Sequence, residues 1–260
     1  MSKLVLLSGW GIDARIWQPL QSHWPEGVSV STPDWPGYGD REPLADPQDL
    51  AALAATMAAD LDPDAVWVGW SLGGLLAAHL LAYLPTPRAL VMLGMGPRFV
   101  SDSHNSNSAV SRVEFKAFQR AFHRDAESTW QHFLRWQLSG EPAPRPAFER
   151  LLDLIGQVPP ATHATLLAGL VQLGTLDATA IVANPPCPML RCQGVRDPLA
   201  SREQARGGQD SDKWATMGSA LLIEEAGHCP QLSQPVALVG YLSDIAYRHA
   251  PSAGRPEETS

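Results

Sequence analysis

Short, almost uninterrupted apolar runs alternate with segments of helical periodicity along most of this chain of 260 residues. We predict strands at residues 3–7, 28–32, 65–69, 89–93, 189–193 and 219–224, and helices at residues 47–61, 72–84 and 236–247. Strands that are apolar at nearly every position are typical of sheets covered on both faces. Because strands and helices alternate at short spacing, the sequence predicts an α/β fold with a mostly parallel central sheet flanked by helices.

The alternation stops at residue 98 and resumes near residue 181. The intervening segment contains no convincing strand, and after a polar opening stretch its pattern is helical. We therefore predict a helical cap at residues 98–180, inserted into a core made of residues 1–97 and 181–249. Residues 250–260 are polar and contain proline, which predicts a disordered tail.

The formal net charge of −8 is distributed unevenly along the chain. The predicted cap carries eight basic and eight acidic residues, so the other 11 basic and 19 acidic residues account for the whole acidic excess. An acidic chain argues against nucleic acid as a partner. No window approaches 18 consecutive apolar residues, which argues against a membrane span. Three cysteines without a C-x-x-C pair indicate reduced thiols, and therefore the cytoplasm.

Residues 69–74 read Gly-Trp-Ser-Leu-Gly-Gly and match the pattern G-x-S-x-G. The pattern alone is weak, but here it follows a predicted strand and opens a predicted helix, as a nucleophile elbow requires. Glycines on either side of Ser71 let two backbone segments approach closely in a strained turn. We predict that Ser71 is a nucleophile; the alternative is a small residue in an ordinary strand-to-helix turn.

A serine hydroxyl needs a base that takes its proton. His228 follows the last predicted strand, at the sheet edge where α/β proteins place their chemistry. Taken alone, His228 would be interpreted as a surface-loop histidine. The presence of Ser71 makes it the candidate base.

An acidic residue between Ser71 and His228 should hold the imidazole in the correct tautomer. Asp197 follows the predicted strand at residues 189–193 and is the candidate. The alternative is a turn aspartate before a proline, and Asp210 and Asp212 are weaker candidates for the same role. The oxyanion formed during acyl transfer needs backbone donors. We predict the N–H groups of Leu72, directly after the nucleophile, and of Trp10, in the Gly-rich loop after the first strand.

With these residues in place, the chain resembles the α/β-hydrolase superfamily over essentially its whole length. Residues 34–40 (DWPGYGD) are similar to its D-x-P-G-x-G-x-S loop, and residues 193–199 (QGVRDPL) are similar to its G-x-x-D-x-x-V/I loop. The chain order Ser, Asp, His is also that of the superfamily. Ser8 stands where most members have the histidine of an H-G motif that supports the oxyanion loop, so this support must differ here.

Within the superfamily, three stretches are similar to the pimeloyl-acyl-carrier-protein methyl ester esterases of biotin synthesis: residues 9–17 (GWGIDARIW), 67–74 (WVGWSLGG) and 133–140 (FLRWQLSG). This resemblance implies hydrolysis of a methyl ester on an acyl chain carried by acyl carrier protein, with no cofactor. It also implies contacts between the acyl chain and four side chains: Trp10, Ile12, Trp70 and Phe133. We expect a monomer.

Four basic residues recur every four positions in the predicted cap: Arg112, Lys116, Arg120 and Arg124. Phenylalanines fall on the opposing side of the same helical wheel, which predicts an amphipathic helix with a basic outer ridge. Acyl carrier protein is acidic, so this ridge is a candidate docking surface; the alternative is an ordinary solvated helix face. By the resemblance, Arg145 matches a carrier-contacting arginine, whereas Ser128, His132 and Glu149 replace basic residues of the family.

Two other classes of function remain open at this point. One is a general carboxylesterase or C–C-bond hydrolase that uses the same triad on a small free substrate. The other is a non-catalytic, hydrolase-like binding module, against which the complete set of Ser71, Asp197 and His228 argues. No group of His, Cys and carboxylate residues has metal-ligand spacing, so we expect no metal.

Overall fold

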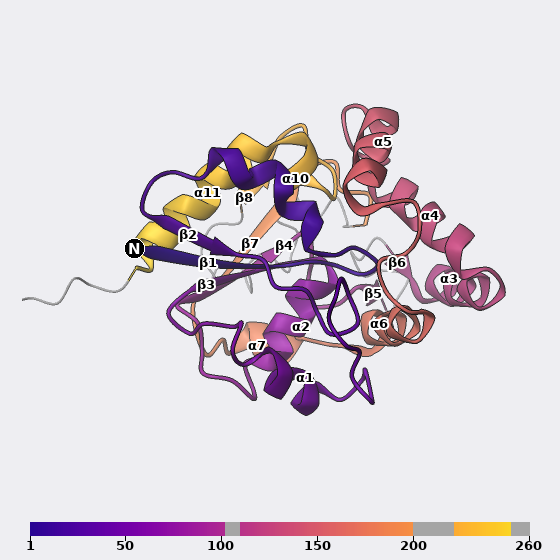
Figure 1. The fold of residues 1–260 in the computed structure, drawn as a ribbon, viewed down its shortest axis with the longest axis horizontal. Coiled ribbons are helices and arrows are strands. Elements are labelled where there is room, and N and C mark those ends of the chain that lie inside the picture. Colours follow the sequence, from indigo (N-terminus) through magenta and orange to yellow (C-terminus); the bar gives the residue numbers. More distant parts are fainter. Residues whose placement is uncertain (102–109, 200–220, 251–260) are drawn as a thin grey trace, which may run out of the picture.

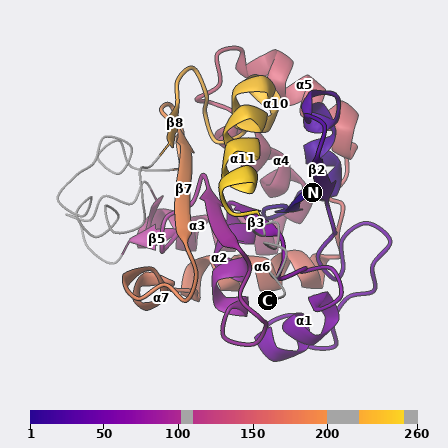
Figure 2. The same cartoon turned by 90° about the vertical axis from the view of Figure 1, so that its left-hand side faces the viewer.

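The computed structural model describes residues 1–101, 110–199 and 221–250 and contains a six-stranded sheet in which every strand pairing is parallel. The strands are β1 (Ser2–Leu7), β2 (Val28–Ser31), β3 (Val66–Trp70), β4 (Ala89–Leu93), β7 (Met189–Gly194) and β8 (Leu221–Ile223). Their order is β2-β1-β3-β4-β7-β8, so β2 and β8 form the two edges (Figure 2). The predicted parallel sheet is confirmed, and each strand lies within two residues of its predicted position in the described part of the chain.

Helices cover both faces of the sheet (Figure 1). On one face lie α1 (Leu50–Met57), α2 (Leu72–Leu80) and α7 (Thr179–Ala183); on the other lie the 3-10 helix η1 (Ala14–His23), α10 (Pro230–Ser233) and α11 (Pro235–Arg248). Helix α1 begins later than predicted because the side chain of Asp49 caps it, accepting from the N–H groups of Ala51 and Ala52. The sequence analysis did not predict η1.

The segment predicted as a cap holds α3 (Arg112–Arg124), α4 (Ala126–Gln137), α5 (Pro144–Ile155) and α6 (His163–Thr175). These helices lie at the end toward which the strands of the sheet run (Figure 1). The segment also holds one short parallel pair, β5 (Val100–Ser101) with β6 (Val110–Ser111), which the sequence analysis missed because two-residue strands show no periodicity. The described residues do not include positions 251–260 of the predicted disordered tail. They also do not include Asp210 and Asp212, the weaker candidates for the acid.

The two ends of this segment lie side by side. Arg98 Nη2 lies 2.6 Å from Asp177 Oδ2, and the N–H of Ala178 donates to the carbonyl of Pro97 across 2.9 Å. The segment therefore leaves the sheet and returns to it at one place, between β4 and β7. Helix α7 crosses residue 180, the predicted end of the cap.

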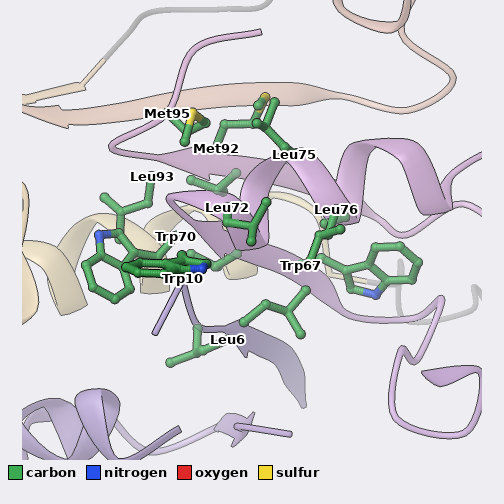
Figure 3. Packing of buried hydrophobic residues seen from close by; sticks show 14 of the residues in the cluster. Leu6, Trp10, Trp67, Trp70, Leu72, Leu75, Leu76, Met92, Leu93 and Met95 are labelled. Carbon is green, nitrogen blue, oxygen red and sulfur yellow. The ribbon is translucent and has the colours of Figure 1, made fainter. Parts of the chain in front are cut away.

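The apolar core lies on both faces of the sheet, with residues of α2 on one face and residues of η1 and α11 on the other. Figure 3 shows side chains from β1 (Leu6), β3 (Trp67), α2 (Leu75, Leu76) and β4 (Met92) packed together. Burial of such side chains contributes about 1.5–3 kcal/mol each. This packing holds the carboxyl ends of β1 and β3 in fixed positions. The connection after β1 leads to β2 on one side of β1, and the connection after β2 leads to β3 on the other side. At such a switch point, an α/β sheet opens a crevice at the carboxyl ends of its strands.

In the described part of the chain, no helix combines the length and the apolar character needed to cross a lipid bilayer.

Candidate active site

Ser71 sits in a strained turn between β3 and α2. Its φ is +54° and its ψ is −127°, a conformation that a residue with a side chain adopts only when its surroundings enforce it. The neighbouring glycines make the turn possible: a Cβ on Gly69 would lie 2.5 Å from the carbonyl oxygen of Gly73, and one on Gly73 would lie 2.5 Å from that of Ser8. This is the geometry of a nucleophile elbow.

His228 and Asp197 lie next to each other, in the loops that follow β8 and β7. Their side chains are fully buried, and His228 Nδ1 lies 2.8 Å from Asp197 Oδ2. The other carboxylate oxygen, Oδ1, accepts from the N–H of Leu199 across 2.8 Å, which fixes the carboxylate in a tight turn. The structure therefore brings together the predicted acid and base. Within the described residues, His228 Nε2 has no hydrogen-bond partner, so no hydrogen bond joins it to Ser71, and its role as the base stays a prediction.

Two residues that the sequence analysis did not assign to the His–Asp pair support it. Gly94, at the end of β4, has a φ of +63°, and a Cβ there would lie 3.2 Å from His228 Nδ1. Trp70 donates its indole N–H to the carbonyl of His228 across 2.8 Å, with the ring centroids 5.5 Å apart. Trp70 thus lies behind the histidine, and its predicted contact with an acyl chain stays a prediction.

The loop after β1 brings the second predicted oxyanion donor next to the elbow. A Cβ on Gly9 would lie 2.9 Å from Ser71 Cβ, so Trp10 follows a glycine that touches the nucleophile. Within the described residues, the backbone N–H groups of Trp10 and Leu72 donate to no other protein group. Their role as oxyanion donors stays a prediction.

Indole and phenol groups hold this loop in place of the histidine that most superfamily members have. Trp35 donates to the carbonyl of Ser8 across 2.9 Å, and Trp130 of α4 donates to the carbonyl of Gly11 across 2.7 Å. The N–H of Gly11 in turn donates to the hydroxyl of Tyr38 across 3.0 Å. The loop is therefore anchored from both the core and the predicted cap.

Trp10 and three phenylalanines form an aromatic cluster over the loop. The ring centroid of Trp10 lies 5.8, 5.7 and 5.1 Å from those of Phe118, Phe122 and Phe133, all in edge-to-face geometry. Two of the predicted acyl-chain contacts, Trp10 and Phe133, belong to this cluster. Ile12, two residues after Trp10 in the sequence, is buried. A pocket adjoins the loop after β1. The residues that line it include Gly9, Tyr38, Leu72, Leu76, Thr165 and Gly169.

Cys229 follows the candidate base directly but is not a competing nucleophile. Burial raises the pKa of its thiol well above the ordinary value, and the nearby carboxyl groups of Glu141 and Asp197 raise it further. The thiol is therefore protonated at neutral pH. In the described ranges, no group of three or more His, Cys, Asp and Glu side chains is placed to hold a metal ion.

The predicted docking residues lie on the outside of the predicted cap. Helix α3 forms as expected, with a capping box between Ser111 and Glu114, and Phe115 and Phe122 face inward. Arg145, near the start of α5, is exposed. The four predicted basic side chains of α3 are exposed as well: Arg112, Lys116, Arg120 and Arg124.

Fold and site together define a hydrolase. Residues 4–240 match the sequence model described as "Alpha/beta hydrolase family", and the chain belongs to this family. Among its curated relatives are proteins named pimeloyl-[acyl-carrier protein] methyl ester esterase. The one from Xanthomonas campestris is 36% identical over 234 residues, which cover 88% of each chain. The one from Stenotrophomonas maltophilia is 31% identical over 255 residues, which cover 96% of this chain and 95% of the relative.

Solved structures share the fold at lower identity. A bromoperoxidase from Bacillus anthracis superposes with a TM-score of 0.79 at 15% identity, covering 95% of this chain and 92% of that one. An esterase from Exiguobacterium antarcticum superposes with a TM-score of 0.77 at 17% identity over the same shares of the two chains. These likenesses concern the fold alone.

Proposed function

We propose that the protein is a serine esterase that hydrolyses the methyl ester of pimeloyl-[acyl-carrier protein] in biotin synthesis, releasing methanol. The buried hydrogen bond between His228 and Asp197, together with the strained elbow of Ser71, carries the proposal that an ester is cleaved. The choice of ester rests on relatives of that name at 31–36% identity over most of the chain.

In the proposed mechanism, His228 Nε2 takes the proton of Ser71 as its oxygen attacks the ester carbonyl. Asp197 holds the Nδ1–H tautomer and stabilises the imidazolium. The amides of Trp10 and Leu72 bind the oxyanion, the tetrahedral intermediate collapses, and His228 protonates the departing methanol. Water activated by His228 then hydrolyses the acyl-enzyme, which frees the carboxylate and leaves the thioester to the carrier untouched.

The aromatic cluster supports an apolar acyl chain as the substrate. Trp10 carries a proposed oxyanion donor on its backbone, while its ring packs on Phe133 of α4. An acyl chain bound at Ser71 therefore meets aromatic side chains of residues 98–180, which we propose to be a cap on the core of residues 1–97 and 181–249. Apolar contacts of this kind are not directional, so the length of acyl chain that the enzyme accepts depends on the depth of its site.

We further propose that the carrier protein docks on the basic ridge of α3. The carrier is acidic, and the ridge exposes Lys116, Arg120 and Arg124 on the helix whose inner face contributes Phe118 and Phe122 to the aromatic cluster. A carrier on α3 would thus sit one helix away from the acyl site. Binding by an exposed charged surface mainly accelerates association. We propose that the enzyme is cytoplasmic, because its three cysteines are free and buried. We also propose that it is a monomer.

The deciding experiment measures methanol release from the methyl ester of pimeloyl-[acyl-carrier protein] and compares kcat/KM with that for p-nitrophenyl acetate. We expect the carrier-linked ester to be preferred by a large factor, and Ser71→Ala to lose both activities. Complementation of a biotin auxotroph lacking this esterase, with Ser71→Ala as the control, should agree. Equal or better turnover of the small ester, together with failed complementation, would instead indicate a general carboxylesterase.

A further inference from the structure

The turn between α4 and α5 contacts both loops that carry the proposed acid and base. A Cβ on Gly140 would lie 1.9 Å from the carbonyl oxygen of Arg196 and 3.1 Å from Pro198 Cδ. Only a glycine therefore lets this turn approach so closely to the loop that carries Asp197. The turn belongs to the proposed cap, whereas Asp197 and His228 belong to the core.

The next residue of the turn, Glu141, contacts the residues on both sides of His228. Its Oε1 accepts a hydrogen bond of 2.9 Å from the backbone N–H of Cys229. The same oxygen would lie 2.8 Å from a Cβ placed on Gly227. The backbone of His228 is thus held by Glu141, while its imidazole is held by Asp197 at 2.8 Å.

Glu141 is poorly suited to a purely stabilising role. The residue is only 4% exposed, and its second oxygen, Oε2, is buried without a partner within the described residues. A buried carboxyl group with unused acceptor capacity costs free energy. Proteins tolerate such local violations mainly at functional sites, and this one lies against the backbone of the proposed base.

We propose that Glu141 is a positioning residue for ester hydrolysis, through which the cap holds His228 in line with Ser71 and Asp197. The inference rests on the proposed function in that His228 must act as the base. Glu141 touches no reacting atom and acts only through the N–H of Cys229. A consequence is that the base is aligned only when the α4–α5 turn is seated on the core.

The test compares Glu141→Ala with Glu141→Gln, whose amide oxygen still accepts from Cys229. Asp153→Ala, which removes an exposed carboxyl group on α5, is the matched control. Three quantities are measured: kcat and KM for p-nitrophenyl acetate, the same constants for the carrier-linked methyl ester, and the rate at which a fluorophosphonate labels Ser71. Thermal unfolding midpoints are recorded for every variant.

We expect Glu141→Ala to lower kcat for both esters and the labelling rate by about 10–100-fold, because small misplacements of catalytic groups have effects of this size. KM should stay close to the wild-type value, and Glu141→Gln and Asp153→Ala should both remain close to wild type. If Glu141→Ala does not fold, Glu141→Asp replaces it, because its shorter side chain cannot reach Cys229 and should give the same slowing.

A lower unfolding midpoint with unchanged kcat and labelling rate would overturn the inference, since Glu141 would then be merely structural. Equal slowing in Glu141→Gln and Glu141→Ala would also overturn it, because the hydrogen bond to Cys229 would not be the cause. Labelling and p-nitrophenyl acetate hydrolysis require the triad and the oxyanion donors but not the carrier protein. A failure of the proposed substrate therefore shows as lost turnover of the carrier-linked ester alone, in the wild type as well.

Discussion

The indole nitrogen of Trp130 in α4 lies 2.7 Å from the carbonyl oxygen of Gly11, in the loop that follows the first strand. A residue of the proposed cap therefore holds the loop that carries a proposed oxyanion donor, the backbone N–H of Trp10. Trp10 itself is held from the same side, because its indole donates to the carbonyl of Leu166 in α6 across 2.7 Å. The geometry of the oxyanion site thus depends on segments far apart in the sequence.

Trp130→Phe should lower kcat, because the loop loses an anchor while the amide of Trp10 remains. The loss should be smaller than the roughly 100-fold that removal of an oxyanion donor itself causes. Stability should fall by about 1–3 kcal/mol, the cost of leaving a buried carbonyl without its partner. Trp67→Phe is the control, since Trp67 makes an equivalent bond to the carbonyl of Asp62, at the opposite end of β3. It should lower stability without changing kcat; equal kcat losses in both variants would contradict the anchoring role.

Asp197→Asn should lower kcat by about 10⁴-fold while leaving the fold intact, because an amide in this position favours the wrong tautomer of His228. Steady-state kinetics on p-nitrophenyl acetate provide the measurement, and circular dichroism checks the fold. A variant that keeps more than about a tenth of the wild-type kcat would show that another group orients His228.

Gly94→Ala should slow the reaction by displacing His228, because the added methyl group would lie 3.2 Å from Nδ1. The φ of +63° at this position adds a strain of about 1–2 kcal/mol for any residue with a Cβ. Gly27→Ala separates these two effects, since Gly27 has a φ of +85° with open space around its Cβ position. Urea unfolding should show similar losses of stability in both variants, whereas kcat should fall only in Gly94→Ala.

Charge reversal on α3 tests the docking surface. The double variant Arg120→Glu/Arg124→Glu should reduce kcat/KM for the carrier-linked methyl ester by about 10-fold or more at low salt, because it removes electrostatic steering of an acidic partner. Hydrolysis of p-nitrophenyl acetate should not change. Arg248→Glu, an exposed reversal at the end of α11, is the control and should affect neither substrate. If the double variant behaves like this control, the carrier docks elsewhere.

The ion pair between Arg98 and Asp177 joins the two ends of the proposed cap and predicts a dependence of stability on pH. The Arg98 guanidinium holds the pKa of Asp177 well below its ordinary value. In the unfolded chain that pKa is about 3.9, so the stabilisation is complete above about pH 5 and is lost as the pH falls through the folded pKa. Asp177→Asn should cost about 0.5–1 kcal/mol at pH 7, because the pair is partly exposed. Urea unfolding of both proteins at neutral and acidic pH should show this difference shrinking in acid; a constant difference would contradict the assignment.

The positions of the sheet strands and of Ser71 were predictable because both depend on local signals. An apolar run bounded by turns is visible in a window of a few residues, and the elbow needs its glycines next to the serine in the chain. Asp197 and His228 could be proposed for a related reason: each lies in the loop after a strand, and parallel strands bring their carboxyl ends to one edge. The structure then placed Asp197 and His228 within hydrogen-bonding distance of each other.

The family, the parallel sheet and the candidates for nucleophile, base and acid follow from local patterns in the sequence. The contacts that hold these candidates are visible only in the folded chain. Gly94 beneath the imidazole, Trp70 behind His228, Trp130 on the oxyanion loop and Glu141 on the N–H of Cys229 carry no periodic or motif signal. The reason is physical: each acts through one hydrogen bond or one close contact between residues as many as 158 positions apart. Such pairs become neighbours only after the sheet and the inserted helices have packed.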